Sequence, residues 1–184
     1  MDLARHLMEE HRVIERVLDA LETAARRLGA GQPVPPALFL QAADFIKGFA
    51  DGCHHMKEED ILFPAMRSTD GPSASGPIGV LMDDHREGRH LNGAMRAAAE
   101  RLAAGDDHAR AELISVATQF VELLRGHIDM EDSAVFPMAE QMLAGPARAE
   151  VSSAIERIVR DEEDQGLRAR FLDLAASIER QAAG

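Results

Sequence analysis

The chain has 184 residues, of which 46% are hydrophobic, and this size suits one domain with a buried core rather than two full domains. Its formal net charge of −12 argues against binding to nucleic acid or to anionic membrane surfaces. The single cysteine, Cys53, excludes an internal disulfide and a metal site built from several thiolates. The sequence contains neither a long apolar run nor the features of a signal peptide, so we expect a cytoplasmic protein that does not enter a membrane.

Glycine and proline interrupt the sequence at four places, and the segments between them repeat apolar residues at helical spacing. The interruptions lie at residues 29–36, 68–77, 105–107 and 145–146. The predicted helices span about residues 3–28, 36–66, 78–104 and 107–143. Long helices joined by short loops pack antiparallel to their sequence neighbours, so we predict an all-α fold, an up-down-up-down four-helix bundle.

An additional C-terminal helical segment is expected beyond this bundle. We predict a bundle over residues 1–145 and a helical extension over 146–184 that packs on its outside. Two apolar stripes in the extension, one beginning at Val151 and the other at Leu167, are out of step with each other. The acidic stretch 161–166 lies between them, and a kink or break is expected there.

The chain contains an internal repeat of a unit that carries histidine. Residues 54–64 and 127–137, which are 73 positions apart, share a His, a Glu four positions later, a second acid and a Phe-Pro pair. Residues 10–12 and 84–86, which are 74 positions apart, share an acid, a His and an Arg. The sequence therefore predicts two helical hairpins of the same design, each with one lone His and one His-x-x-x-Glu.

The positions of the predicted loops put these histidines at one level. In an antiparallel pair, residues at equal height lie symmetrically about the turn, and the midpoints between successive histidines are 32.5, 69.5 and 106, each inside a predicted loop. A His and a Glu four positions apart also share one helix face. Six side chains are therefore expected to converge inside the bundle: His11, His54, Glu58, His85, His127 and Glu131.

Four imidazoles and two carboxylates at one buried level predict a pair of metal ions. Burying such groups without compensation costs about 1–3 kcal/mol each, and more for charges. Nitrogen and oxygen ligands without thiolate suit iron or manganese better than structural zinc. Six ligands are too many for one four-coordinate zinc, and they suit two metals that share bridging carboxylates. Glu58 and Glu131 occupy corresponding positions in the repeat, so both can bridge.

These motifs resemble the hemerythrin-like, or HHE cation-binding, family over about residues 5–140. The similar segments are Glu-His-Arg at 10–12, His-x-x-x-Glu with Leu-Phe-Pro at 54–64, Asp-His-Arg-Glu-Gly-Arg at 84–89, and His-x-x-x-Glu with Val-Phe-Pro at 127–137. The resemblance implies two iron ions, or manganese, joined by an oxo or hydroxo bridge. It also implies that the four histidines are terminal ligands and that the two glutamates bridge.

One position departs from the family's oxygen carriers, which have a second histidine one turn after the ligand of the third helix. Arg89 stands there in this chain, and His90 is rotated by about 140° from His85. Three residues can supply the missing ligand: Glu15, His55 and Glu59. A site with fewer imidazoles and an extra carboxylate favours the ferric state and redox chemistry over reversible oxygen carriage.

Three classes of function are compatible with this site. The first is a non-haem di-iron protein that interacts with dioxygen, nitric oxide or peroxide in sensing, scavenging or redox defence. The second is an oxidoreductase with catalase, peroxidase or nitric oxide-reducing activity. The third is a regulatory bundle in which the metal only staples the helices. An electron donor would have to be external, because the sequence has no cysteine-rich segment for electron delivery.

Overall fold

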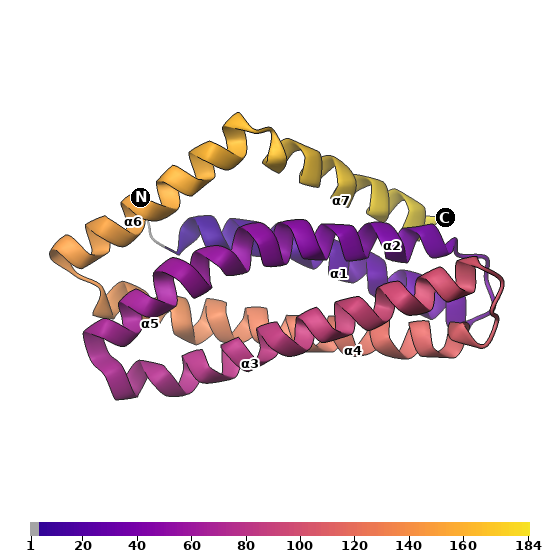
Figure 1. Ribbon diagram of the computed structural model, residues 1–184, viewed down its shortest axis with the longest axis horizontal. Helices are drawn as coiled ribbons and strands as arrows, with labels where there is room; N and C mark the ends of the chain where they lie inside the picture. The colour runs from indigo at the N-terminus through magenta and orange to yellow at the C-terminus, as the bar shows by residue number, and fades with distance from the viewer. Residues whose placement is uncertain (1–3) are drawn as a thin grey trace.

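The computed structural model describes residues 4–184, with the side chains of 4–69 and 76–184. This described part is almost entirely helical and contains no strand (Figure 1), which confirms the all-α prediction. The first helix, α1 (Arg5–Gly29), matches the predicted helix over 3–28. Its buried residues recur every three or four positions, as expected of a helix that packs one face against a core.

The second predicted helix is continuous but changes its winding. It begins as α2 (Pro36–Phe45), with proline in the first turn, where no backbone donor is lost. It then becomes π-helical in η1 (Ile46–His55) and again in η2 (Glu58–Leu62). Such wide turns are rare and occur mostly at functional sites. The apolar spacing of the sequence does not predict these π-helical turns.

The prediction of a loop at 68–77 is wrong, because α3 (Phe63–Ala103) is helical through this segment. The change of direction that we expected there is nevertheless present. Arg89 donates to Asp51 at 2.6 Å and Asn92 donates to Ala43 at 3.2 Å, so later residues of α3 meet earlier residues of the preceding helix and the two run antiparallel. Proline fixes φ near its helical value while removing a donor, so prolines such as Pro77 can bend a helix without unwinding it.

The second hairpin is closed by α4 (Ala109–Met130), η3 (Glu131–Val135) and α5 (Phe136–Met142), which together occupy the predicted helix over 107–143. Gly105 makes the turn before it with φ 93°, a conformation that glycine adopts without strain. The π-helical turn η3 begins 73 residues after η2, so the internal repeat extends to the backbone.

The C-terminal extension forms two helices, α6 (Gly145–Asp164) and α7 (Leu167–Ala183). The break predicted over 161–166 is confirmed, since Gly166 has a left-handed φ of 68°. In Figure 1 the two helices form a wide V over the side of the bundle made by α1 and α2, and α7 packs against both. The division of the chain into two parts at residue 145 stays a prediction.

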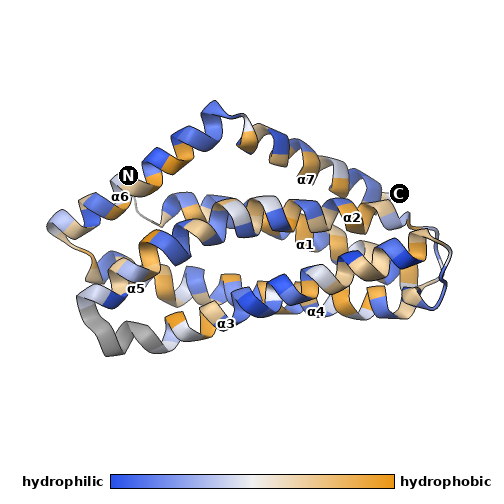
Figure 2. Cartoon of the chain, in the orientation of Figure 1, coloured by the Kyte–Doolittle hydropathy of each residue, from blue (hydrophilic) through white to orange (hydrophobic). Residues whose placement is uncertain are grey.

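The apolar core is divided into two clusters, with a layer of buried polar side chains between them. The larger cluster contains Phe39, Phe45, Phe49, Phe120, Leu124 and Ile128. The smaller cluster contains Leu7, Leu62, Phe63, Val135, Phe136 and Ile155. Orange and blue alternate along the helices in Figure 2, as expected of amphipathic helices. Among the described residues, no helix is long and apolar enough to cross a membrane. The cytoplasmic location stays a prediction.

Candidate metal centre

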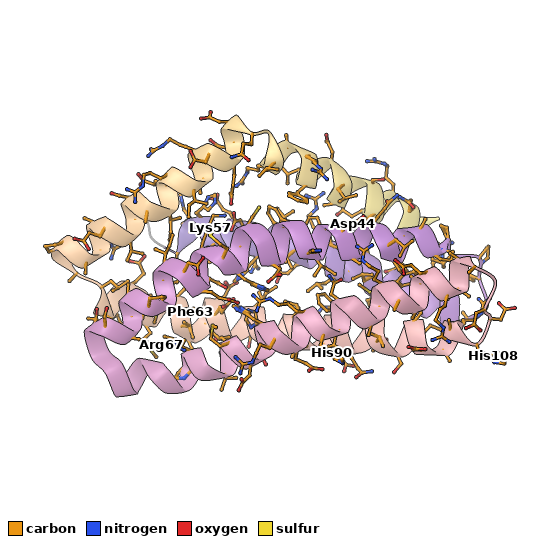
Figure 3. All side chains as sticks on the ribbon, in the orientation of Figure 1. Asp44, Lys57, Phe63, Arg67, His90 and His108 are labelled. Carbon is orange, nitrogen blue, oxygen red and sulfur yellow. The ribbon has the colours of Figure 1, made fainter. Side chains whose placement is uncertain are left out.

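Two groups of buried side chains meet between the two apolar clusters. The first group is His11, His54, Glu58 and Glu131. The second group is His55, Glu58, His85 and His127. Within each group, one potential ligand atom of every residue lies within 4.8 Å of the others. Nitrogen-bearing side chains gather between the helices near Phe63 in Figure 3. Glu58 belongs to both groups, so the two positions adjoin.

The structure brings all six predicted residues together and distinguishes the three candidates for a further ligand. His55 joins the second group. Glu15 is only partly buried and pairs with Arg12 at 3.1 Å, outside both groups. Glu59 lies behind the ring of His85, with 2.7 Å between its Oε1 and Nδ1 of the histidine. That these side chains bind metal stays a prediction.

The wide turns of η1 and η2 explain how His55 reaches the centre together with His54. Successive residues of an α-helix point about 100° apart, so two adjacent side chains rarely face one site. A π-helical turn closes over one more residue, which brings neighbouring side chains closer in direction. Glu58 begins η2, one turn further along the same face. Sequence spacing based on α-helical geometry could not anticipate this arrangement.

The imidazoles direct their Nε2 atoms at one another. The Nε2 atoms of His11 and His54 are 2.9 Å apart, and those of His85 and His127 are 3.2 Å apart. Two nitrogen lone pairs at this separation repel each other unless a proton or a metal cation lies between them. Each of these two places therefore requires a proton or a metal cation.

The Nδ1 atom of each imidazole faces a carboxylate. The five pairs are His11–Asp132 at 2.7 Å, His54–Glu10 at 2.9 Å, His85–Glu59 at 2.7 Å, His127–Asp84 at 3.6 Å and His55–Asp51 at 3.7 Å. The first three pairs are at hydrogen-bond distance, and because a carboxylate only accepts, it holds the ring proton on Nδ1 and leaves Nε2 free for a metal. The Nδ1 atoms of His127 and His55 have no hydrogen-bond partner among the described residues. The sequence suggests Glu59 only as a ligand and gives the other four acids no role, although four of the five coincide in the repeat.

The carboxylates of the centre stay ionised despite their burial. Burial alone would raise the pKa of Glu58, but the charge of the His54 ring, whose Nε2 lies 3.3 Å from Oε1, outweighs it and holds the pKa well below its ordinary value. Burial and the Glu58 charge likewise act to raise the pKa of Glu131, and His127 and His11 outweigh them and lower it. The two acids therefore offer anionic oxygens over the ordinary pH range.

The imidazoles divide into two kinds. Burial opposes protonation of His54, yet the carboxylates of Glu58 and Glu10 raise its pKa to about 10. His127 behaves alike, with its pKa raised to about 10 by Glu131 and Asp84 against the effect of burial. Burial dominates at His55 and lowers its pKa to about 4. Without metal, protons on His54 and His127 thus take the place of the missing cationic charge.

The residues present fit metal ions. All four carboxylate oxygens of Glu58 and Glu131 are buried and have no hydrogen-bond partner. Buried oxygens are rarely left in this state, because an unsatisfied polar group costs about 1–3 kcal/mol. Metal cations would satisfy these oxygens and the Nε2 lone pairs together, and a donor set of imidazole and carboxylate suits iron.

A second buried charge network adjoins this centre. Lys57 is 0% exposed, and its Nζ lies 2.9 Å from Oε1 of Glu10 on α1 and 2.9 Å from Oε1 of Glu162 on α6 (Figure 3). Burial disfavours the ammonium, but the two carboxylates outweigh it and raise the pKa of Lys57. Glu10 also accepts from His54, so the network connects the C-terminal extension to the candidate metal centre.

Comparison with known proteins agrees with this geometry. The family model for the hemerythrin HHE cation binding domain matches residues 2–139. An uncharacterized protein of Mycobacterium tuberculosis is 28% identical over 150 residues, which cover 82% of this chain and 58% of that protein. The iron-sulfur cluster repair protein YtfE of Dickeya chrysanthemi is 31% identical over 88 residues, 47% of this chain and 40% of that protein.

The match thus spans only about half the length of these curated relatives, 58% of the mycobacterial protein and 40% of YtfE. No solved structure matches it.

Proposed function

The chain belongs to the hemerythrin HHE cation-binding domain family, and we propose that it is a non-haem di-iron protein. Its centre would interact with dioxygen, nitric oxide or peroxide in sensing, scavenging or redox defence. One observation carries this proposal: the two buried groups of potential ligands share Glu58. A carboxylate common to two such groups is the arrangement expected where two metal ions are bridged.

The proposal assigns a role to each set of residues. His11 and His54 would hold one ion, whereas His55, His85 and His127 would hold the other. Glu58 and Glu131 would bridge, since Oε2 of Glu131 lies 3.1 Å from Nε2 of His11 and 3.2 Å from Nε2 of His127. The outer carboxylates of Asp132, Glu10 and Glu59 would fix three of the rings by accepting from Nδ1.

Iron is proposed as the metal, with manganese as the alternative. The donor set lacks thiolate and combines imidazole with carboxylate, which suits both metals. The similarity to a protein that is named for iron-sulfur cluster repair adds support for iron. An iron pair supplies two cations that each change oxidation state by one electron. An external electron donor would then be required.

Catalysis is a second candidate: peroxide disproportionation or reduction of nitric oxide. The inequality of the two groups favours it. One contains two imidazoles and the other contains three. The ion with two imidazoles would retain more room for an external ligand, as a reactive metal position requires.

Metal analysis combined with an absorption spectrum tests the proposal. The protein as purified should contain two iron ions per chain and display charge-transfer bands of a di-iron centre. His54→Ala should lose at least one ion while retaining its helicity. His90→Ala is the matched control, because His90 is exposed on α3 and lies outside both groups (Figure 3). Unchanged iron content in His54→Ala would contradict the assignment.

Three experiments distinguish the functional alternatives. Rapid oxygen evolution from added peroxide would favour the enzyme, and reversible bleaching under argon would favour a carrier. Unfolding on metal removal, without reaction toward any of the three small molecules, would favour a bundle that the metal only staples.

A further inference from the structure

A pocket opens beside the candidate metal centre, between η1, α3 and α4. Its volume is about 390 Å³, and His55 and His85 form part of its wall. The pocket is more than ten times larger than the volume of about 30 Å³ that one water occupies in the liquid. It falls instead in the range of about 300–1,000 Å³ that is typical of sites for small organic molecules. A diatomic gas alone does not account for it.

The pocket depends on a difference between the two repeats. Gly88 and Gly93 line it, and the residues 74 positions earlier are Ile14 and Asp19. Ile14 is buried, whereas the glycine that corresponds to it leaves that space open. A β-carbon at Gly88 would lie 3.5 Å from Cδ2 of Leu124, which also lines the pocket. Gly88 therefore leaves room where the other repeat has the buried side chain of Ile14, whereas Asp19 is exposed and lines a separate pocket between α1 and α4.

Two buried polar atoms at this pocket lack partners. The side chain of Asn92 is 9% exposed, and its Nδ2 donates to the carbonyl oxygen of Ala43 at 3.2 Å. A carbonyl can only accept, so this contact fixes the amide orientation and leaves Oδ1 as a buried acceptor without a donor. Nδ1 of His55 is also buried without a hydrogen-bond partner. A hydroxyl group can donate its proton to Oδ1 of Asn92.

The charges at the rim of the pocket cancel, which favours a neutral ligand. Arg89 donates to Asp51 and to Glu59, and Arg96 donates to Asp44. Lys47 also lines the pocket, so three positive charges face three negative ones. The wall is otherwise mostly apolar and contains the following side chains: Ile46, Ala50, Phe120 and Leu124. An aromatic ring suits such a wall, since it can pack against phenylalanine and beneath a guanidinium group.

We propose that this pocket binds a small neutral phenol, with the ring against the apolar wall and the hydroxyl donating to Oδ1 of Asn92. The ligand would lie against His55 and His85. Its position beside a metal ion rests on the proposed function, whereas its binding in the pocket does not.

The test is a titration of the full-length, metal-loaded protein with 4-fluorophenol, followed by ¹⁹F NMR. We expect saturable binding, and binding of 4-fluorotoluene, which lacks the donor, that is weaker by about fivefold or more. Asn92→Leu should abolish this preference. Gly88→Ile, which introduces the residue of the other repeat, should abolish binding of both probes. Gly93→Phe fills the pocket from a position with open space around it and serves if Gly88→Ile folds poorly.

Gly126→Phe is the matched control. Gly126 also lies within a helix with nothing near its absent β-carbon, but it does not line the pocket, so binding should persist. Absence of saturable binding, or binding that survives both pocket-filling variants, would overturn the proposal.

Metal analysis of the same samples separates the two hypotheses. Iron-loaded protein that does not bind the probe refutes the pocket alone. Protein that binds the probe in the pocket but takes up no iron refutes only the proposed function.

Discussion

The two hairpins of this bundle are built on one plan and differ at a few positions. In each hairpin, the lone histidine and the histidine of the His-x-x-x-Glu unit point Nε2 into the centre. The outer carboxylates also correspond across the repeat: Glu59 and Asp132 stand 73 residues apart, and Glu10 and Asp84 stand 74 apart. Glu10 and Asp84 face the second histidine of their own hairpin, whereas Glu59 and Asp132 accept from the lone histidine of the other hairpin. The plan therefore includes the support of the ligands as well as the ligands.

The difference between the hairpins lies in η1. The first hairpin has His55 with Asp51 behind it, whereas the second has Ile128 and Leu124 at these positions, within the regular helix α4. Lys57 likewise corresponds to Met130. A repeated frame thus provides a symmetric set of ligands, and a few changes in one hairpin make the two metal positions unlike. Each of the following predictions tests how far the symmetry extends.

The largest expected effect is a loss of stability of the metal-free protein at high pH, and both hairpins should contribute to it alike. His54 and His127, one from each, have folded-state pKa values near 10, above the ordinary value of 6.5. A histidine whose pKa is higher in the folded state than in the unfolded state stabilises the folded state. This stabilisation is fully present below the unfolded-state pKa, and it is lost as the pH rises through the folded-state pKa. The free energy of unfolding of metal-free protein should therefore fall between about pH 7 and about pH 10, by at most about 1.4 kcal/mol per pH unit for each histidine.

Urea unfolding at several pH values measures this loss, and metal-loaded protein is the control. Bound metal replaces the protons on these rings, so its stability should change little over the same interval. A metal-free protein whose stability is constant or rises up to about pH 10 would contradict the charge arrangement described here.

Lys57→Met introduces the residue of the second hairpin into the first. It leaves the carboxylates of Glu10 and Glu162 without the ammonium between them, and breaking a buried ion pair costs about 3–5 kcal/mol. We expect a loss of this size in the free energy of urea unfolding. Lys47→Met is the matched control, because it removes the same charge from an exposed side chain. Equal effects of the two substitutions would show that the buried network contributes nothing.

His55→Ile makes the two hairpins alike at their main difference. It removes one imidazole from the group that contains His85 and His127, so affinity for one of two metal ions should fall about tenfold or more. Metal titration followed by calorimetry resolves the two binding steps. Ile128→Val, at the corresponding position, should leave both steps unchanged. If His55→Ile also left both unchanged, His55 would not be a ligand.

The sequence sufficed to predict the helices and the level of the centre, because both follow from regular geometry. Apolar periodicity located the helices, and symmetry about the turns brought His11, His54, His85 and His127 to one height. The break near Gly166 followed from two apolar stripes that are out of step. These features depend on rise and rotation per residue, which are nearly constant in a helix.

The features that sequence analysis missed depend on departures from that geometry or on contacts between distant segments. The π-helical turns rotate His55 inward, and α-helical spacing gave no reason to prefer it over Glu15. The bend of α3 replaced the loop expected at 68–77. Lys57 was overlooked, because its partner Glu162 lies 105 residues away on a helix whose packing was unknown.

The smallest expected effect concerns how the first hairpin holds α7. Gly48 lies against the ring of Phe171 on α7, and a β-carbon there would overlap Cζ of that ring. Phe171 is 7% exposed and packs with Phe45 and Phe49 at centroid distances of 6.2 and 5.8 Å, so the ring has little freedom to move. Gly48→Ala should therefore destabilise the protein by about 1–3 kcal/mol, despite the better helix propensity of alanine.

Gly126→Ala is the control for Gly48→Ala, because Gly126 also lies in a helix but has no atom within 4 Å of its absent β-carbon. Only propensity acts there, so alanine should stabilise the protein by about 0.5–1 kcal/mol. Opposite signs for the two glycines in urea unfolding would establish that α7 packs against the first hairpin as described. Stabilisation by both would mean that α7 does not press on Gly48 in solution, and that the extension is held mainly through Lys57 and Glu162.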